Sequence, residues 1–451
     1  MSDYNSIVAS MFERHRSVQT AGFSGSAYKP GLEQMRDYAA SLGNPEQAFR
    51  SIHVAGTNGK GSVCSMLAAA IAARGLRTGL YTSPHLLDFR ERIKLVTLTG
   101  DRSLYRRTSA SLHPSHLFEA GPSRSRGHGR PRFSGQRPGP GEGAAMIPEE
   151  AVCAFMERYD REGLSFFEVT TGMAFKWFAD SAVDVAVIET GLGGRLDSTN
   201  IITPELSIIT SIGLDHCELL GNTRAEIAAE KAGIFKPGVP ALVWGRDPET
   251  APVFTRIAAE KGSPLYFAED YTVPDGLQPD LSGPCSELNL RTVIAALSIL
   301  GDDSPDLEAV CSAARITGLH GRWEQLLADP PVICDIGHNP PALEHNFARL
   351  AAMGRHMLVV YGVMADKDID SIVHFMPQQA EYFLTAPATP RAMGVKDLAL
   401  KLKNLNFTES GSVARGVQDA LLRARELPDP VVYIGGSTFV VSEALSYFQG
   451  V

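Results

Sequence analysis

Short apolar runs that alternate with helical stretches constrain the fold of this chain most strongly. Strands that are apolar along their whole length are buried on both faces, as in a parallel sheet covered by helices. Such runs occupy residues 52–56, 185–191, 207–213, 241–245, 332–337, 358–364 and 431–436. Helical stretches follow or separate them at residues 60–74, 147–162, 165–180, 223–233, 288–300, 341–353 and 416–427. We therefore predict an α/β fold with mostly parallel sheets.

The length of the chain and one break in the alternation predict two domains. The chain has 451 residues, of which 44% are hydrophobic, so it can bury more than one core. The alternation of strands and helices restarts after "GRWEQLLADPP", residues 321–331, which we interpret as a joint. We therefore expect a larger domain over residues 1–325 and a smaller, Rossmann-like α/β domain over residues 326–451.

Residues 97–145 differ in composition from the rest of the chain. They include eight Arg and five Pro but no Val, Ile, Lys or Asn. A segment so poor in apolar β-branched residues cannot offset the entropy of its own ordering by burial. We interpret it as a disordered or anomalous insertion, including a stretch read in the wrong frame, in preference to a basic functional arm.

Charge and cysteine usage exclude several classes of protein. The net charge of −9 provides no basic field to attract a nucleic acid. The six cysteines are scattered without a C-x-x-C pair, which is typical of reduced thiols in a cytoplasmic protein. The polar start of the chain predicts no signal peptide, and no apolar run approaches the length of a membrane span. We expect a cytoplasmic protein with no membrane or nucleic-acid partner.

The stretch "HVAGTNGKGSV", residues 53–63, has the strand–loop–helix context of a phosphate-binding loop. Backbone N–H groups of a glycine-rich loop and of a helix N-terminus bind anions, and Lys60 adds a positive charge. The usual loop pattern places a magnesium-binding hydroxyl directly after its lysine, and it starts with a glycine. Here Gly61 follows the lysine and Val54 occupies the first position, so the sequence predicts a nucleotide site whose metal ligands lie elsewhere. A loop whose glycines only ease a tight turn is the less favoured alternative.

Three later turns offer polar side chains for that metal. Ser83 precedes a proline, Glu189 ends one apolar strand, and Asp215 and His216 follow another. Ligands in open α/β sheets bind at the carboxyl ends of strands, so these turns are expected to converge on the phosphate loop. Taken singly, each residue is more often a satisfied polar group than a ligand.

Lys231 lies on the apolar side of its predicted helix. Ile227, Lys231 and Ile234 have the spacing i, i+4 and i+7, which places the lysine on the buried stripe. A buried lysine loses its charge readily, whereas a lysine that extends along its stem to solvent keeps it. Spacing alone favours the second interpretation.

The motifs together resemble the folylpolyglutamate synthase/dihydrofolate synthase family of the Mur-ligase superfamily. The resemblance covers about residues 1–96 and 146–451. It is carried, in the family's order, by "GTNGKGS", "TSPHL", "FRERI", "FFEVTTGMAF", "ETGLGGRLDSTN", "LDH", "EKAGIFKPG", "GRWE" and "DIGHNP". It implies a P-loop-type ATPase domain followed by a Mur-type glutamate ligase domain.

The resemblance also implies an activity. Members are ATP-dependent amide ligases that phosphorylate the carboxylate of dihydropteroate or of a folate's glutamate tail. The amine of L-glutamate then attacks the acyl phosphate, releasing ADP and phosphate. Which of these acceptors is used, or whether both are, stays open, and we lean toward both. We expect a monomer that requires ATP and Mg²⁺, with two metal ions.

The resemblance assigns roles to individual residues. The ATP site comprises Asn58, Gly59, Lys60, Gly61, Ser62, Asn289, Arg322 and Asp335. Ser83 and Glu189 hold one magnesium, and His216 joins Glu189 around a second. Lys231 is the family's carbamylated lysine, which favours a functional role over an extended one, and His338 faces the reaction centre together with Lys60. The pterin end of the substrate contacts Ser165, Phe166, Phe167, Glu168 and Asp197.

The sequence departs from the family's pattern at two places, and two alternative functions stay open. The family usually has His-Gln shortly before the residue matching Asn289, whereas this chain has "PCSELN". The segment 97–145 replaces a short connection, so substrate access near Ser83 could differ. One alternative is another Mur-superfamily amino-acid ligase, but those of the cell wall carry a sizeable UDP-binding domain before the phosphate loop, for which the roughly fifty residues here are too few. The other alternative is a non-catalytic nucleotide-binding protein, if the segment 97–145 disrupts the site.

Overall fold

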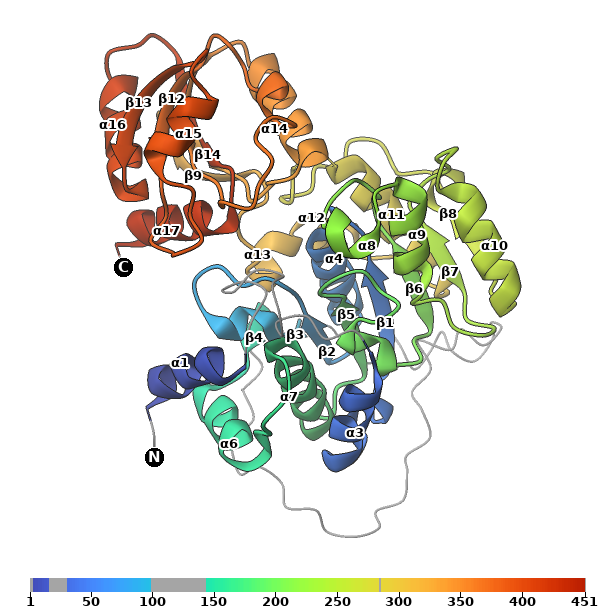
Figure 1. Cartoon of the computed structure of the whole chain (residues 1–451). Helices are drawn as coiled ribbons and strands as arrows, with labels where there is room; N and C mark the ends of the chain where they lie inside the picture. Colours follow the sequence, from blue (N-terminus) through green and yellow to red (C-terminus); the bar gives the residue numbers. More distant parts are fainter. Residues whose placement is uncertain (1–2, 16–30, 99–142, 284, 451) are drawn as a thin grey trace. The chain divides into compact units, whose positions relative to one another are not determined.

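The computed structural model describes residues 3–15, 31–98, 143–283 and 285–450, and the chain forms two compact units (Figure 1). The first unit comprises Met1–His85, Phe89–Asp280 and Glu287–Leu319, and the second comprises Leu86–Asp88, Leu281–Ser286 and His320–Val451. The predicted boundary after residue 325 falls inside strand β9 (Glu324–Ala328), so part of the predicted joint is a strand of the second unit. Two short stretches earlier in the chain also belong to that unit.

The first unit contains an eight-stranded sheet in the order β4-β3-β2-β5-β1-β6-β7-β8. Neighbouring strands are parallel from β2 to β8, and β3 and β4 add an antiparallel hairpin at one edge. The strands are β1 (Arg50–Ala55), β2 (Thr78–Tyr81), β3 (Ile93–Thr97), β4 (Gly143–Met146), β5 (Val185–Glu189), β6 (Leu206–Ile209), β7 (Ala241–Val243) and β8 (Leu265–Phe267).

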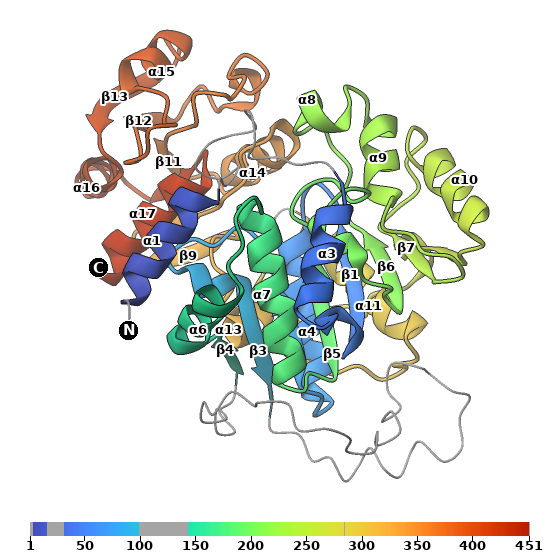
Figure 2. The ribbon, with the colours of Figure 1, turned by 60° about the horizontal axis from the view of Figure 1, so that its bottom comes forward.

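Helices cover this sheet as the apolar strands require. Helix α4 (Lys60–Ala73) contacts β1, β2, β3 and β5, and it is buried nearly all round because α12 and α13 pack on it. Helices α3 and α7 pack on each other and lie together in Figure 2. The helices of the unit are α1 (Tyr4–Arg14), α3 (Glu33–Ser41), α4, α6 (Glu149–Tyr159), α7 (Phe166–Asp180), α8 (Cys217–Leu220), α9 (Arg224–Ala232), α10 (Ala251–Lys261), α11 (Ser286–Ile299), α12 (Leu307–Cys311) and α13 (Ala313–Thr317).

The second unit contains a six-stranded sheet in the order β13-β12-β11-β14-β10-β9, in which only β9 is antiparallel to its neighbour. Alternate residues of β11, such as Val359 and Val360, belong to two separate cores. One core includes α14 and α15, and the other includes α16 and α17. The further elements are β10 (Pro331–Cys334), β11 (His356–Tyr361), β12 (Glu381–Thr385), β13 (Asn406–Gly411), β14 (Pro430–Gly435), α14 (Pro340–Ala352), α15 (Val395–Lys401), α16 (Val413–Ala424) and α17 (Thr438–Gln449).

The α/β fold class with mostly parallel sheets is confirmed, and each of the seven apolar runs overlaps a strand. All seven of these strands end earlier than predicted, since the glycine at or near the end of each run lies outside the strand or, in β14, at its last residue. The strands that sequence reasoning missed are the four edge strands β4, β8, β9 and β13 and the interior strands β2, β3 and β12. Most of the anomalous segment 97–145 lies outside the described residues, but its flanks are β3 and β4, which pair with Thr97 opposite Gly143.

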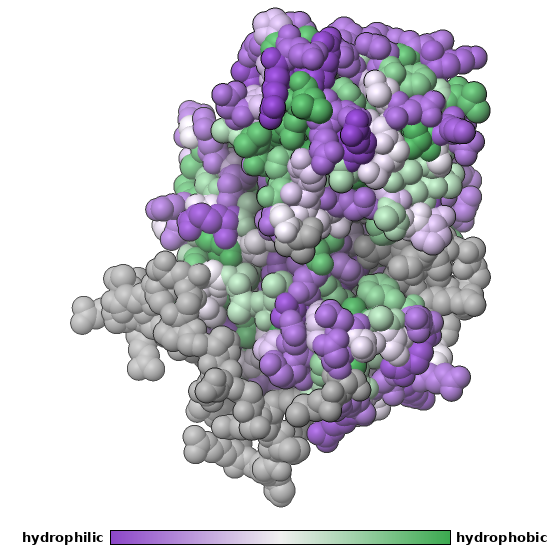
Figure 3. Space-filling model, turned by 90° about the vertical axis from the view of Figure 1, so that its left-hand side faces the viewer, coloured by the Kyte–Doolittle hydropathy of each residue, from purple (hydrophilic) through white to green (hydrophobic). Residues whose placement is uncertain are grey.

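No helix among the described residues is long and apolar enough to cross a membrane. On the face drawn in Figure 3, hydrophobic side chains are interspersed with polar ones. Among the described residues, the large hydrophobic side chains that are most exposed, Leu400 and Leu422, lie on helices α15 and α16 of the second unit.

Candidate active site

The phosphate loop joins β1 to α4, and two of its glycines have backbone conformations that other residues rarely adopt. Gly56 has φ +154°, and a Cβ atom there would lie 1.8 Å from Thr210 Oγ1. Gly59 has φ +90° and is the N-cap of α4. The N–H groups of the first turn of a helix have no partner within the helix, so those of residues 60–62 are available to an anion. The usual loop pattern has a glycine at the position of Val54. In this chain the loop requires its glycine two residues later, at Gly56.

The end of β6 holds the loop in place. Thr57 N donates to Ser211 O over 2.7 Å, and Asn58 N donates to Ser211 Oγ over 3.1 Å. The hydroxyls of Thr210 and Ser211 both donate to Asn58 O, over 2.8 and 3.0 Å. Sequence reasoning missed these two hydroxyl residues, although "TS" directly after an apolar strand is a detectable signal. The loop is thus preorganised by hydrogen bonds to the neighbouring strand.

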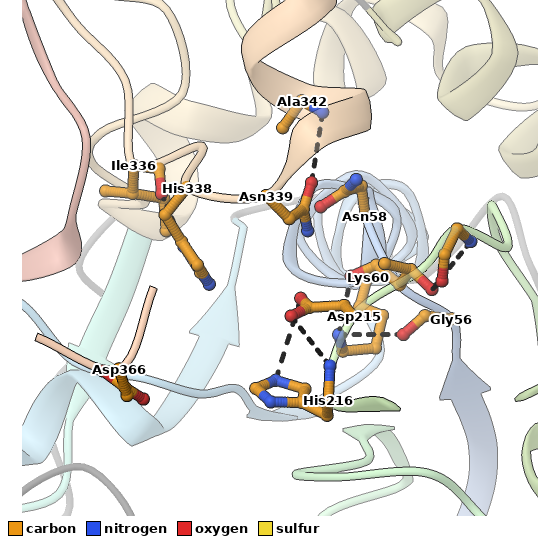
Figure 4. Close-up of polar contacts among 12 residues, drawn as sticks. Gly56, Asn58, Lys60, Asp215, His216, Ile336, His338, Asn339, Ala342 and Asp366 are labelled. Atoms are coloured by element: carbon orange, nitrogen blue, oxygen red, sulfur yellow. Dashed lines mark hydrogen bonds and ion pairs between the residues drawn. The ribbon is translucent and has the colours of Figure 1, made fainter. Parts of the chain in front are cut away.

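Lys60 begins α4 and its side chain turns back over the loop (Figure 4). Its Nζ donates to Gly56 O over 3.0 Å and to Thr57 O over 3.2 Å. It also lies 4.0 Å from Glu189 Oε1. Glu189 is buried at the carboxyl end of β5, and its Oε2 accepts a hydrogen bond from Ser83 N over 3.1 Å. The structure therefore brings Lys60, Ser83 and Glu189 together, whereas their binding of a metal and of phosphates stays a prediction.

Asp215 and His216 follow β6 as predicted. His216 has a left-handed backbone with φ +54°, and its N–H donates to Asp215 Oδ1 over 3.0 Å. Its ring Nε2 lies 3.7 Å from Asp215 Oδ2, so the two side chains face each other (Figure 4). The predicted partnership of His216 with Glu189 around a second metal stays a prediction.

Lys231 is buried rather than extended to solvent. Its side chain is in the last turn of α9, and its Nζ donates to Gly56 O over 2.8 Å. Gly56 O therefore accepts hydrogen bonds from both Lys60 and Lys231. Burial first, and the nearby charge of Lys60 second, lower the pKa of Lys231 to about 7. A substantial fraction of this amine is neutral near neutral pH.

Asn289 lies beside the loop despite the atypical residues before it. It is buried in the first turns of α11, and a Cβ atom on Gly59 would lie 2.4 Å from its Oδ1. This close approach is a second reason why position 59 requires glycine. Asn289, the predicted ATP contact, is thus placed against the glycine that caps α4, whereas contact with ATP itself stays a prediction.

The residues predicted to bind the pterin have structural contacts of their own. Ser165 caps α7 in a reciprocal capping box with Glu168, which is buried and accepts from Ser165 N over 2.7 Å. The ring of Phe166 stacks on that of Phe12 at a centroid distance of 4.5 Å, and Phe167 packs so closely on Gly191 that a Cβ atom would lie 2.5 Å from it. Contact of these four residues with a substrate stays a prediction.

Asp197 is almost fully buried and precedes a short 3-10 helix, η4 (Ser198–Ile201). Its Oδ1 accepts hydrogen bonds from the N–H and the hydroxyl of Thr199, and its Oδ2 accepts from Leu192 N over 2.8 Å. Burial raises the pKa of Asp197, and these hydrogen bonds oppose that rise. The carboxylate is thus held in one orientation by three donors.

In the second unit, Asp335 follows β10 and organises the residues around it. Its Oδ2 accepts from Trp323 N over 2.9 Å, and its Oδ1 accepts from Gly337 N and Asn346 Nδ2, each over 2.7 Å. Trp323 has a left-handed backbone with φ +52°. Asp335 therefore fixes the strained residue next to Arg322, a role that the sequence did not reveal. Direct contact of Arg322 and Asp335 with ATP stays a prediction.

His338 and Asn339 lie in the loop between β10 and α14. His338 Nδ1 is 3.0 Å from Ile336 O, and Asn339 caps α14 by accepting from Ala342 N over 3.1 Å (Figure 4). Because a carbonyl oxygen only accepts, Nδ1 of His338 carries a proton and donates it to Ile336 O. The predicted position of His338 at the reaction centre stays a prediction.

Comparisons with known proteins identify the family. Residues 321–438 match the family model described as Mur ligase, glutamate ligase domain. The dihydrofolate synthase/folylpolyglutamate synthase of Escherichia coli is 30% identical over 425 residues, which cover 90% of this chain and 88% of that protein. The protein of the same name from Bacillus subtilis is 30% identical over 449 residues, covering 92% and 94%. The chain belongs to the dihydrofolate synthase/folylpolyglutamate synthase family.

Solved structures of family members share its fold. E. coli FolC in complex with DHPP and ADP has a TM-score of 0.76 at 27% identity, covering 100% of this chain and 98% of that one. The Yersinia pestis bifunctional folylpolyglutamate synthase/dihydrofolate synthase, complexed with AMPPNP and Mn ion, has a TM-score of 0.76 at 26% identity, with the same coverage. The predicted family, fold class and class of ATP-dependent ligase are confirmed.

The family implies a divalent cation, and part of the predicted ligand set suits one. Mg²⁺ prefers oxygen donors and retains several waters, so it needs only one or two protein ligands. Glu189 supplies a buried carboxylate beside Ser83 at the end of β5. The described residues contain no group of three or more His, Cys, Asp and Glu side chains with metal-site geometry. A site completed by phosphate oxygens and water is consistent with both observations.

Proposed function

We propose that this chain ligates L-glutamate to the carboxylate of dihydropteroate, of a folate's glutamate tail, or of both, using ATP and a divalent cation. The observation that carries the proposal is the meeting of Lys60 and Lys231 at Gly56 O, beside the buried carboxylate of Glu189. Two amines, one carboxylate and a helix N-terminus at one loop form a site for a metal-bound polyphosphate.

The chemistry has two steps. A carboxylate oxygen of the acceptor attacks the γ-phosphorus of ATP, which forms an acyl phosphate as the bond to ADP breaks. The amine of glutamate then attacks the acyl carbon, an amide bond forms, phosphate leaves and the nitrogen loses a proton. The N–H groups of residues 60–62 and the Lys60 ammonium stabilise the charge on the transferring phosphoryl oxygens.

Ser83 and Glu189 would hold one magnesium ion, and Glu189 with His216 a second. When bound, these ions neutralise charge on the transferring phosphoryl group. Glu189 is suited to the role because its carboxylate is buried and already oriented by Ser83 N. The positive charge of Lys60 Nζ, at 4.0 Å from Glu189 Oε1, partly offsets the negative charge of the Glu189 carboxylate.

We further propose that Lys231 is carbamylated, as its family resemblance implies. The neutral amine attacks carbon dioxide, a C–N bond forms, and one proton is released. The lowered pKa of Lys231 makes the neutral amine available near pH 7. The product is an anion that relieves the repulsion between two neighbouring cations, and its oxygens can face the metal site.

Arg322, Asp335 and Asn289 would contact ATP, His338 would face the reacting groups, and the pterin would bind near Asp197 and residues 165–168. We propose that the enzyme acts as a cytoplasmic monomer without nucleic-acid or membrane partners. Size-exclusion chromatography with light scattering tests the oligomeric state.

ADP release tests the function. ATP and glutamate should give little ADP alone, and addition of dihydropteroate or of tetrahydrofolate, assayed separately, should stimulate it. Stimulation by a UDP-muramyl peptide instead would assign the chain to cell-wall ligases. No stimulation by any acceptor would favour a non-catalytic nucleotide-binding protein.

A further inference from the structure

A buried histidine on β1 has no role in the site described so far. His53 is fully buried in the middle of the first unit's sheet, between Ile188 of β5 and Ser207 of β6. Its Nε2 lies 2.8 Å from Thr199 Oγ1, and its Nδ1 has no hydrogen-bond partner among the described residues. A histidine in a sheet core is costly unless its polar atoms are used.

The hydrogen bonds of Thr199 connect this histidine to Asp197. Thr199 Oγ1 has one proton, and it lies within hydrogen-bond distance of both Asp197 Oδ1 and His53 Nε2. Asp197 Oδ1 also accepts from Thr199 N over 3.0 Å, and Oδ2 accepts from Leu192 N, which is the pattern of an ionised carboxylate. The Thr199 proton therefore points to Asp197, and His53 must donate through Nε2–H.

The Nδ1 atom of His53 also indicates that the ring donates through Nε2. If the proton of His53 were on Nδ1, an N–H group would be buried without an acceptor, which is rarer and more costly than an unused acceptor nitrogen. Burial, with the charge of Lys236 as a second cause, lowers the pKa of His53 to about 3, so the ring stays neutral and carries a single proton. That proton is on Nε2.

We propose that His53 is a positioning residue for the substrate-binding carboxylate Asp197, acting through the Thr199 hydroxyl. By occupying the lone pair of Thr199 Oγ1, His53 fixes the direction of the hydroxyl proton, and the hydroxyl in turn fixes the orientation and ionised state of Asp197. The effect on catalysis rests on the proposed function, in which Asp197 contacts the pterin, but the hydrogen-bond direction does not.

A pair of amide substitutions separates this role from simple core packing. In His53→Gln the amide nitrogen occupies the place of Nε2 and keeps the N–H donor, whereas in His53→Asn the amide ends near the place of Nδ1 and loses it. We expect His53→Asn to raise the KM for the pterin-bearing substrate roughly tenfold, with the KM for ATP unchanged. His53→Gln should restore the KM to within about twofold of wild type.

Two measurements keep the proposal testable if His53→Asn folds poorly. Thr199→Val removes the hydroxyl and should raise the same KM, and adding His53→Gln or His53→Asn to it should change the KM no further. Nitrogen NMR of histidine-labelled protein, assigned with His53→Gln, should show His53 as the Nε2–H tautomer.

The outcomes separate this proposal from the proposed function. A wild-type protein without ligase activity overturns the proposed function, and with it the effect on KM, while the NMR result still tests the hydrogen-bond direction. An Nδ1–H tautomer, or equal KM values for His53→Asn and His53→Gln in an active enzyme, would overturn the positioning role. A uniform loss of stability and of both KM values would show that His53 only packs the core.

Discussion

Lys231 Nζ donates a hydrogen bond to Gly56 O over 2.8 Å, linking residues 175 positions apart in the chain. The bond ties the last turn of α9 to the first residue of the phosphate loop. It places a buried amine where Lys60 already donates to the same oxygen. The chain has assembled two amines at one carbonyl, and burial first, with the nearby charge of Lys60 second, lowers the pKa of Lys231.

Replacement of Lys231 by Ala should lower kcat by about 100-fold, because the anionic carbamate at the metal site is lost. A short carboxylate such as acetate should restore part of the rate by occupying the same space. Lys231→Met fills the space of the lysine stem and leaves no room for acetate, so acetate should not restore the rate of this variant. Rescue is measured as kcat against acetate concentration, and a fully active Lys231→Ala enzyme would contradict the carbamate.

The stability of the protein should depend on pH through Lys231. Its pKa is about 7 in the folded state and near 10.5 in the unfolded state, so between these values the unfolded state binds more protons. The free energy of unfolding should therefore rise with pH across this window, by at most about 1.4 kcal/mol per pH unit. Denaturant unfolding without bicarbonate, compared with Lys231→Met, isolates the effect. Identical pH dependences of the two proteins would refute the lowered pKa.

Gly56→Ala should destroy the phosphate loop. The added Cβ atom would lie 1.8 Å from Thr210 Oγ1, and the hydroxyl of Thr210 also holds Asn58 O. We expect the KM for ATP to rise at least about tenfold. The matched control is Gly238→Ala, which has φ +71° but open space around it, so it adds backbone strain without a collision. Equal effects of the two substitutions on the KM would count against the loop geometry.

Glu189→Gln should abolish metal-dependent turnover, because it removes the charge of the buried ligand while keeping its shape. The drop in kcat should be at least about 100-fold at any magnesium concentration. Glu218→Gln, a carboxylate in the first turn of α8, is the control and should leave the magnesium dependence unchanged. A Glu189→Gln enzyme with near-normal turnover would refute the metal assignment.

The segment between β3 and β4 should be dispensable for folding. Thr97 and Gly143 face each other across the hairpin, so a two-residue Asn-Gly turn in place of residues 98–142 can join the strands. We expect the shortened protein to unfold within a few degrees of the full chain. A Gly/Ser segment of the original length is the control. Failure of the shortened chain to fold, with the control folded, would show that the hairpin needs the longer connection.

Much of the site could be predicted because its residues lie at the ends of strands that the apolar pattern identifies. Glu189 after β5 and His216 after β6 are examples, and parallel topology brings such ends to one edge. The burial of Lys231 could not be predicted from its helix alone, since the partner Gly56 O is distant in sequence. Nor could the role of Asp335, whose three donors come from separate positions around it.

The most direct test of the central claim is the fate of the acceptor's carboxylate oxygen. Dihydropteroate or tetrahydrofolate carrying an isotopic label in that carboxylate is incubated with ATP, magnesium, glutamate and the enzyme. An acyl phosphate transfers one labelled oxygen to the released phosphate, and mass spectrometry of the phosphate should detect it together with the glutamylated product. Glutamylated product with unlabelled phosphate, or no product from either acceptor, would contradict the account.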